Sequence, residues 1–187
     1  MPRVKTATKT SAPSSSPGRQ LRYAVAMSLD GFIAGPAGEY DWITMDPDID
    51  FGAIFKRYDA FVMGRKTYQV SGAGMMGGST VVVFSTTLRP EDHPGVTIVS
   101  GPVEPAIRDL KARPGKDIWL FGGGELFRSM LAARLVDAVD VAIVPILLGD
   151  GIRFLPSPAP RAGLSLTNHR HYPKSGIMSL EYAVTYR

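Results

Sequence analysis

Residues 118–126 have the sequence IWLFGGGEL, in which an apolar stretch ends in three glycines before a Glu-Leu pair. The apolar part is typical of a buried strand, and the residues after the glycines favour a helix. Gly122, Gly123 and Gly124 permit a sharp backbone turn and let a ligand approach without a Cβ in the way. The free N–H groups at the start of the helix favour an anion such as a phosphate group. A tight turn without a ligand is the alternative that this segment alone leaves open.

Two further predicted strands also end in residues that suit a phosphate group. These residues are Gly64, Arg65, Lys66 and Thr67 after strand 60–63, and Ser85 and Thr86 after strand 80–84. A glycine, two cations and several hydroxyl groups near a helix start provide hydrogen-bond donors and positive charge. In a parallel sheet the carboxyl ends of the strands meet at one edge, where the ligands of α/β proteins bind.

Strand-like and helix-like segments alternate through the rest of the chain. The predicted strands are 21–28, 32–34, 60–63, 80–84, 96–99, 117–121 and 138–148, the helices are 46–59, 103–113 and 125–135, and a hairpin joins 164–172 to 177–186. Strands separated by helices indicate parallel β-α-β units, and the hairpin indicates an antiparallel edge. We therefore expect an α/β fold with a mostly parallel central sheet, helices on both faces and an antiparallel C-terminal edge hairpin.

The chain has 187 residues, 44% of them hydrophobic and 20% charged, as in ordinary globular proteins. This length predicts one domain, which we assign to residues 21–187. Residues 1–20 are rich in Ser, Thr, Ala and Pro and contain no acidic residue, and they predict a flexible basic extension. A transit peptide is the alternative for this segment.

The positive charge of the chain lies in this extension and argues against nucleic acid as a partner. The formal net charge is +4 from 21 basic and 17 acidic residues, and the extension alone carries Arg3, Lys5, Lys9 and Arg19. The remaining residues are electrically balanced, whereas a surface that binds nucleic acid concentrates basic residues on the fold. The sequence has no cysteine, no apolar run of membrane-spanning length and no residue set with metal-ligand spacing. We therefore expect no metal, no membrane partner and a cytoplasmic location.

Five segments, taken in order, resemble the dihydrofolate reductase superfamily. They are 23–34 (YAVAMSLDGFIA), 41–43 (DWI), 63–68 (MGRKTY), 121–124 (FGGG) and 144–151 (VPILLGDG). The likeness spans residues 21–186 and is greatest to the branch that contains the reductase domain of riboflavin biosynthesis. It implies a three-layer dihydrofolate-reductase-like fold, NADPH as the cofactor and hydride transfer as the reaction.

The resemblance also implies which residues hold NADPH. For the pyrophosphate and the 2′-phosphate they are Gly64, Arg65, Lys66 and Thr67, and for the phosphate on the adenosine side they are Ser85 and Thr86. The loop and helix that hold the pyrophosphate and flank the nicotinamide are Gly122, Gly123, Gly124, Glu125 and Leu126. Ala26 and Ile33 pack near the nicotinamide ring. Arg65 and Lys66 would pair with the additional negative charge that NADPH carries compared with NADH.

Three residues are candidates for catalysis beside the substrate. Asp48 stands near the position where dihydrofolate reductases carry a carboxylate that helps to protonate the pterin. The alternative role of Asp48, and of Asp46, is that of a helix N-cap. Asp30 is either a substrate-orienting carboxylate or the Asp of an Asp-Gly turn. Trp42 either forms a wall of the substrate pocket or belongs to the core.

The sequence departs from both reductase families where they bind substrate. Ala142 stands for the Thr that supports the catalytic acid of dihydrofolate reductases, and Asp41 for the Pro before the Trp. Segment 70–78 (VSGAGMMGG) stands for the Asp-x-Pro of the riboflavin-pathway reductases. These departures argue against the substrates of both families.

We therefore predict hydride transfer from NADPH to a C=N or C=O bond of a small heterocycle that is pteridine- or pyrimidine-like. An authentic dihydrofolate reductase and a non-catalytic NADPH-binding regulatory module are the alternatives. We also expect a homodimer, paired through the apolar strand 139–148 and the C-terminal hairpin.

Overall fold

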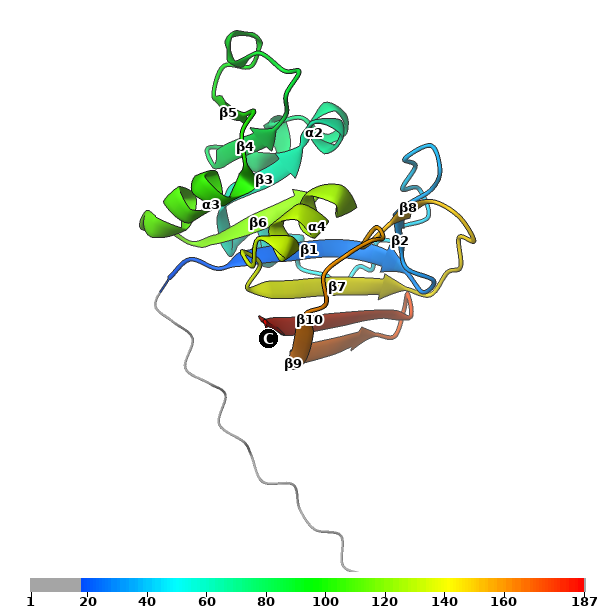
Figure 1. Cartoon of the computed structure of the whole chain (residues 1–187). Coiled ribbons are helices and arrows are strands. Elements are labelled where there is room, and N and C mark those ends of the chain that lie inside the picture. The colour runs from blue at the N-terminus through cyan, green and yellow to red at the C-terminus, as the bar shows by residue number, and fades with distance from the viewer. Residues whose placement is uncertain (1–17, 187) are drawn as a thin grey trace, which may run out of the picture.

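The computed structural model describes residues 18–186, apart from the side chain of Met75. Its centre is an eight-stranded sheet with the strand order β5-β4-β3-β6-β1-β7-β10-β9 (Figure 1). The strands are β1 (Leu21–Ser28), β3 (Tyr58–Gly64), β4 (Thr80–Phe84), β5 (Val96–Val99), β6 (Asp117–Gly122), β7 (Ala138–Val144), β9 (Gly163–Tyr172) and β10 (Ile177–Thr185). The first six in spatial order run parallel, and β10 and β9 form an antiparallel hairpin at one edge.

Helices cover both faces of this sheet. The helices are α1 (Phe51–Lys56), α2 (Arg65–Ser71), α3 (Val103–Ala112) and α4 (Gly124–Ala132), with short 3-10 turns η1 (Gly74–Met76) and η2 (Pro90–Asp92). The helices α3 and α4 pack on one face, and α1 and α2 on the other. A separate two-stranded sheet pairs β2 (Phe32–Ala34) with β8 (Ile152–Arg153). The predicted dihydrofolate-reductase-like three-layer α/β fold, with its antiparallel edge hairpin, is confirmed.

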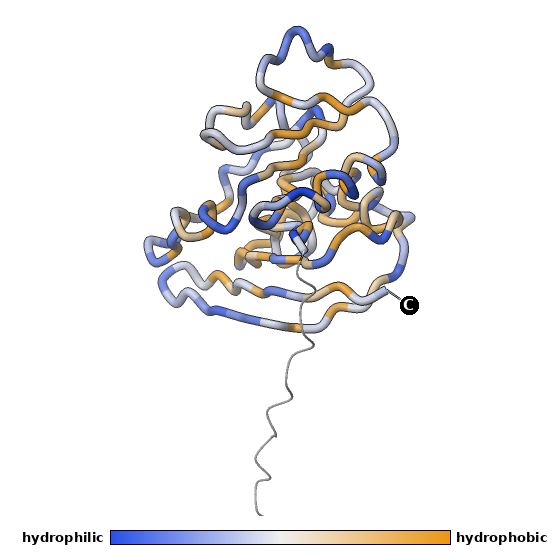
Figure 2. The backbone as a smooth tube through the Cα atoms, turned by 90° about the vertical axis from the view of Figure 1, so that its left-hand side faces the viewer, coloured by the Kyte–Doolittle hydropathy of each residue, from blue (hydrophilic) through white to orange (hydrophobic). Residues whose placement is uncertain are grey.

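The central strands are apolar throughout because both of their faces are covered. In β3, Ala60 and Val62 belong to the core under α3 and α4, whereas Phe61 and Met63 belong to the core under α1 and α2. Successive side chains of a strand point to opposite faces, so each core takes every second residue. Figure 2 shows the resulting concentration of hydrophobic residues in the middle of the molecule.

The helix predicted over residues 46–59 is much shorter in the structure and begins at Phe51. Its N-cap is Asp50, whose carboxylate accepts the N–H of Ala53 at 2.8 Å. The carboxylate of Asp46 accepts the N–H groups of Asp48 and Ser175, both at 2.9 Å. Asp46 therefore closes a turn ahead of the helix, and the N-cap role that we considered for Asp46 and Asp48 is wrong.

The strand predicted over residues 138–148 ends at Val144, because Pro145 has no N–H to continue the hydrogen-bond ladder. This strand, β7, is paired with β1 on one side and with β10 on the other. It has no free edge, so the expectation that 139–148 pairs with a second copy is wrong. The free edge on this side of the sheet belongs to β9.

The N-terminal boundary lies slightly earlier than predicted. Residues 1–17 of the predicted extension lie outside the described residues. Arg19 forms an ion pair with Asp59 and donates a hydrogen bond to the carbonyl of Lys116 at 2.6 Å. The carbonyl of Gln20 accepts the N–H of Ile118 at 2.8 Å, so the fold already includes these two residues. Between residues 18 and 186, no helix combines the length and the apolar character needed to cross a membrane.

Candidate active site

The glycine turn between β6 and α4 lies at the carboxyl edge of the parallel strands. Gly122 has a φ of 148°, in the region that favours glycine, and the peptide bond between Gly122 and Gly123 is cis. A Cβ on Gly122 would lie 3.4 Å from Oγ1 of Thr67, and a Cβ on Gly123 would lie 3.8 Å from the same atom. Thr67 belongs to the first turn of α2, so the structure brings the two predicted phosphate motifs together.

The helix α4 begins directly after this turn, and its first N–H groups lack helical partners. Its N-cap is Gly123, which has no side chain to accept hydrogen bonds from them. The first backbone bond of the helix runs from the N–H of Phe127 to the carbonyl of Gly123. The N–H groups of Gly124, Glu125 and Leu126 therefore offer donors at the positive end of the helix.

Two residues at this helix start also have structural tasks. A Cβ on Gly124 would collide with the carbonyl oxygen of Arg153, so glycine is required there by close packing. The carboxylate of Glu125 is exposed and forms an ion pair with Arg128 at 2.6 Å. The side chain of Glu125 therefore has a partner on its own helix, and the backbone N–H is what it offers to a ligand.

A cavity of about 390 Å³ opens next to α2, at the carboxyl ends of β4 and β5. We call it the hydroxyl cavity because Arg65 lines it together with the hydroxyl-bearing residues Ser85, Thr86, Thr87 and Ser100. The Ser85 oxygen accepts the N–H groups of Thr87 and Leu88, both at 3.1 Å, and so shapes the turn. Lys66 is exposed and does not line the cavity. One guanidinium and several hydroxyl groups are a suitable set of donors for a phosphate group.

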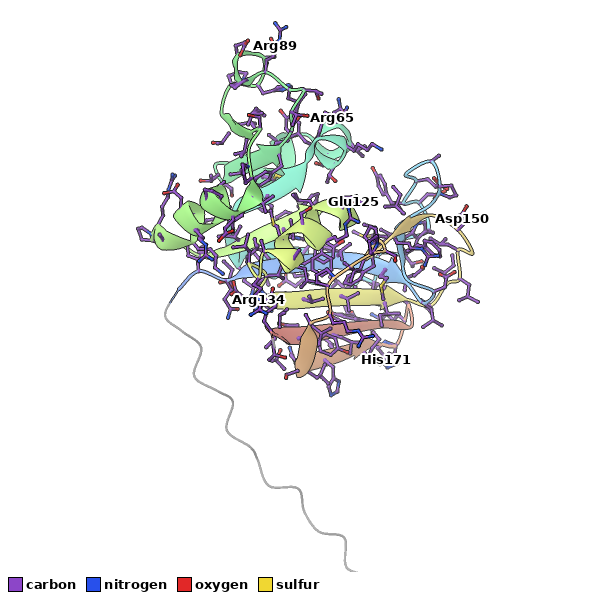
Figure 3. All side chains as sticks on the ribbon, in the orientation of Figure 1. Arg65, Arg89, Glu125, Arg134, Asp150 and His171 are labelled. Atoms are coloured by element: carbon purple, nitrogen blue, oxygen red, sulfur yellow. The ribbon has the colours of Figure 1, made fainter. Side chains whose placement is uncertain are left out.

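These hydrogen-bond donors and Arg65 gather at one edge of the molecule. In Figure 3, Arg65 and Glu125 lie on the side toward which the parallel strands run, whereas Arg134 lies at the opposite end. The strand β6, which carries the glycine turn, stands between β3 and β1 in the sheet. The turn therefore separates the hydroxyl cavity from the strands β1 and β7.

A second cavity, of about 240 Å³, lies on the α1 face of the sheet over β1, β7 and β10. We call it the alanine cavity, because Ala24, Ala26 and Ala142 form its floor and Trp119 lines it from β6. Small side chains at these positions leave a flat apolar space that suits a planar ring. Of these residues, only Ala26 was predicted from the sequence. The small residues at alternate positions in 24–26 could have indicated the others on the same face of the strand.

The end of the alanine cavity that lies away from the carboxyl edge, here called its inner end, is charged. Arg57, Asp140 and Glu181 line it, and Arg22 lies beneath them with 5% of its surface exposed. Arg22 holds Asp140 with two hydrogen bonds, from Nε at 2.8 Å and from Nη2 at 2.6 Å. Burial raises the pKa of Asp140, while the Arg22 guanidinium acts in the opposite direction. Burial also raises the pKa of the neighbouring Tyr58 to about 12.

The predicted catalytic residue Asp30 is engaged with the backbone. Its carboxylate accepts the hydroxyl of Ser28 at 2.6 Å and the N–H groups of Leu148 and Gly149 at 3.1 and 2.7 Å. These hydrogen bonds, that of Ser28 first, lower the pKa of Asp30 to about 2. The carboxylate is therefore ionised at neutral pH, and it joins the turn after β1 to the loop after β7.

The structure does not bring Asp48 and Trp42 into the lining of either cavity. Asp48 is exposed and accepts a hydrogen bond from Nζ of Lys174 at 2.9 Å. Trp42 packs against the apolar cluster around Val144 and donates its ring N–H to the carbonyl of Glu39 at 3.3 Å.

Ile33, in β2, also lies outside both linings. In the part of the chain that the structure describes, no group of His, Cys, Asp or Glu side chains could hold a metal ion.

Known proteins share this architecture. The sequence profile of the family described as the RibD C-terminal domain matches residues 19–177. The uncharacterized protein YyaP of Bacillus subtilis (strain 168) is 31% identical over 179 residues, which cover 88% of this chain and 94% of that protein. A putative riboflavin biosynthesis protein from Shewanella sp. PV-4 has a crystal structure with a TM-score of 0.75 and 26% identity, covering 89% of this chain and 99% of that chain. RibD of Acinetobacter baumannii has the same fold, with a TM-score of 0.71 and 17% identity over 90% of this chain and 58% of that chain. The profile runs from β1 to the start of β10, and the chain belongs to the RibD C-terminal domain family.

Proposed function

We propose that the protein is an NADPH-dependent reductase that transfers a hydride to a C=N or C=O bond of a small planar heterocycle. The observation that carries this proposal is the pair of cavities on the two sides of β6, the strand that carries the glycine turn. One is lined by a guanidinium and hydroxyl groups and suits a phosphate. The other is flat and apolar and suits a ring.

The residues along the carboxyl edge fit NADPH. Arg65 and the hydroxyl groups of the hydroxyl cavity would hold its 2′-phosphate, with Lys66 adding charge at the rim. Thr67 and the N–H groups at the start of α4 would hold the pyrophosphate, and the missing side chains of Gly122 and Gly123 leave room for it. Ala26 would lie against the nicotinamide. When bound, NADPH supplies the hydride.

The chain itself supplies position and protection from water. The segment 43–50 and α1 line the alanine cavity opposite the sheet. They would shield from water the face of a bound ring that points away from the alanine floor. Thr44, Met45, Phe51 and Arg57 of its lining are exposed, so the cavity opens to solvent beside them. Since Asp30 and Asp48 do not line the cavity, we propose that the proton for the reduced substrate comes from water at this opening, and that both carboxylates position loops.

A binding experiment tests the cofactor assignment. Replacing Arg65 by Ala removes the cation that lines the hydroxyl cavity and is expected to weaken NADPH binding at least tenfold, with a smaller effect on NADH. Arg89→Ala is the matched control, because Arg89 is an exposed arginine in the loop after β4 and does not line the cavity. Fluorescence titration measures the affinities. Equal NADPH affinity of the Arg65→Ala and Arg89→Ala proteins would contradict the assignment of the hydroxyl cavity to the cofactor.

A single-turnover experiment separates the reductase from a cofactor-binding regulatory module. The protein is mixed with NADPH and one of a panel of pteridines, aminopyrimidines and quinonoid compounds, and the loss of NADPH absorbance is followed. Oxidation that depends on one compound supports the reductase. Tight NADPH binding without oxidation by any compound supports the regulatory module.

A further inference from the structure

The charged end of the alanine cavity has no part in the reduction as proposed above. In the sheet, Asp140 of β7 lies between Ala24 of β1 and Glu181 of β10. These residues stand two positions further from the carboxyl edge than Ala26. At a rise of roughly 3.3 Å per residue, the two levels are about 7 Å apart, which is comparable to the width of a planar ring system. A ring with its reacting atoms near Ala26 therefore reaches the charged end with its inner edge.

Arg57 is the residue at this end that has donors to spare. Its Nη1 donates to Glu181 at 3.1 Å, and its Nε lies 3.4 Å from a carboxylate oxygen of Asp117. Its Nη2 makes no hydrogen bond with any residue that the structure describes, and 40% of the side chain is exposed. A guanidinium has five N–H donors in a rigid fork. Glu181 and Asp117 thus hold the guanidinium group, and Arg57 lines the cavity with donors that these two carboxylates do not use.

The charge around Arg57 selects against an anion. Asp140, Glu181 and Asp117 face the two guanidinium groups of Arg57 and Arg22, within 4 Å of at least one of them. Three carboxylates against two guanidinium groups leave an excess of negative charge. A phosphate or carboxylate group of a ligand would be repelled here, whereas a neutral acceptor can take a hydrogen bond from Arg57 without disturbing these ion pairs.

We propose that Arg57 is the specificity-determining residue of the alanine cavity, donating a hydrogen bond to an uncharged acceptor on the inner edge of a planar heteroaromatic substrate. The acceptor is a carbonyl oxygen or a ring nitrogen, and the surrounding carboxylates exclude anionic groups from this edge. The inference rests on the proposed function only in taking this ligand as the molecule that is reduced.

Three planar compounds of the same ring size test the inference by calorimetric titration of the full chain without NADPH. They are quinoxaline, quinoxalin-2-one, which adds a ring carbonyl, and quinoxaline-2-carboxylate, which adds an anion. The wild-type protein is expected to bind quinoxalin-2-one roughly tenfold more tightly than quinoxaline, the effect of one net hydrogen bond, and to bind the carboxylate most weakly. Equal affinity for the first two compounds, including no binding of either, or tightest binding of the carboxylate overturns the inference.

Substitution of Arg57 then assigns the preference to this residue. Arg57→Met is expected to reduce the tenfold ratio between quinoxalin-2-one and quinoxaline to about one, because the donor is lost. Arg113→Met is the control, since Arg113 follows the last residue of α3, forms an exposed ion pair with Asp109 and does not line the cavity. A ratio that stays at ten in the Arg57→Met protein overturns the inference. The ratio within one protein is unaffected by a general loss of stability, and the wild-type comparison does not depend on how the variant folds.

The outcomes for Arg57 and for the reductase are separable. If the wild-type protein neither binds nor oxidises NADPH, the proposed function fails, while the ratio of the two affinities still decides the role of Arg57. If the ratio does not depend on Arg57 but NADPH is oxidised, the inference fails and the reductase stands.

Discussion

At the scale of single residues, Tyr23 places a hydroxyl group in the apolar core. The residue has no exposed surface, and its ring stacks on Phe127 with a centroid distance of 4.0 Å. Its hydroxyl has no hydrogen-bond partner among the described residues, and burial raises its pKa. A buried polar group without a partner costs free energy, because its hydrogen bond to water in the unfolded chain is not replaced.

Replacing Tyr23 by Phe is therefore expected to raise the free energy of unfolding by about 1 kcal/mol. The control is Tyr186→Phe, because the Tyr186 hydroxyl donates to the carbonyl of Val136 at 2.8 Å. This second substitution is expected to lower the free energy of unfolding by about 1 kcal/mol. Urea unfolding followed by circular dichroism measures both, and a loss of stability in both proteins would contradict the account of Tyr23.

Asp30 gives the stability a dependence on pH. Its pKa is lowered from 3.8 to about 2 in the folded protein, so the folded state favours the ionised carboxylate. The stabilisation is complete above roughly pH 4, the pKa in the unfolded chain, and is lost as the pH falls through the folded-state value. The difference in stability between the wild-type and Asp30→Asn proteins is expected to be largest at pH 5–7 and to fall steeply between pH 4 and pH 2. Urea unfolding at each pH measures this difference in the free energy of unfolding. A difference that does not change with pH would argue against the hydrogen bonds of Asp30.

At the scale of elements, the segment 43–50 is tied to the turn between β9 and β10. Asp46, which is 2% exposed, accepts the N–H of Ser175 at 2.9 Å, and hydrogen bonds from Ser175 lower its pKa. Asp48 forms an ion pair with Lys174 on the surface. Because the segment lines the alanine cavity, the hairpin turn helps to set the position of that wall.

The two carboxylates are expected to contribute unequally to this connection. Asp46→Ala removes a buried acceptor and is expected to increase amide hydrogen exchange in the segment 43–50 and at Ser175 at least tenfold. Asp48→Ala removes an ion pair with a half-exposed side chain and is expected to change exchange little. Hydrogen exchange followed by mass spectrometry compares the two proteins, and an equal response would show that Asp46 does not hold the segment.

Local patterns account for what could be predicted at this scale. Apolar runs ending in glycine or hydroxyl residues identified the parallel strands and their carboxyl edge. The helix over 46–59 was predicted too long because Ile49 matches a helical spacing, although it packs with Trp42 and Val144 from a turn. The charged end of the alanine cavity was missed because Arg57, Asp140 and Glu181 come from segments far apart in the chain. The register of β7 and β10 pairs Asp140 with Glu181, and Arg57 reaches them from the junction of α1 and β3.

At the scale of the whole molecule, the sheet leaves β9 as an open edge. This ten-residue strand is paired on one side only, with β10, and nearly all of its side chains are exposed. Leu164 and Leu166 are about half exposed, and His171 lies further along the same strand (Figure 3). A long edge strand of this kind is a site for pairing with another chain. We propose a homodimer in which two β9 strands pair across a two-fold axis.

Size-exclusion chromatography with light scattering tests this proposal. The wild-type chain is expected to have the mass of a dimer, and Leu166→Lys that of a monomer, because charge at a paired edge prevents association. Leu147→Lys is the control, since Leu147 is 70% exposed but lies in the loop after β7. A wild-type monomer, or a dimer that persists in the Leu166→Lys protein, would exclude pairing through β9.

The place of β1 in the sheet has a consequence for synthesis on the ribosome. This strand is the first of the described chain to emerge, yet Tyr23 pairs with Leu120 of β6 and with Val139 of β7. Pairing between residues so distant in sequence is slow, and until it occurs the apolar surface of β1 is exposed. The nascent chain must carry β1 unpaired until β6 has left the exit tunnel, and paired on one side only until β7 follows. The incompletely synthesised chain is therefore expected to aggregate more readily than the complete protein and to benefit from binding by a chaperone.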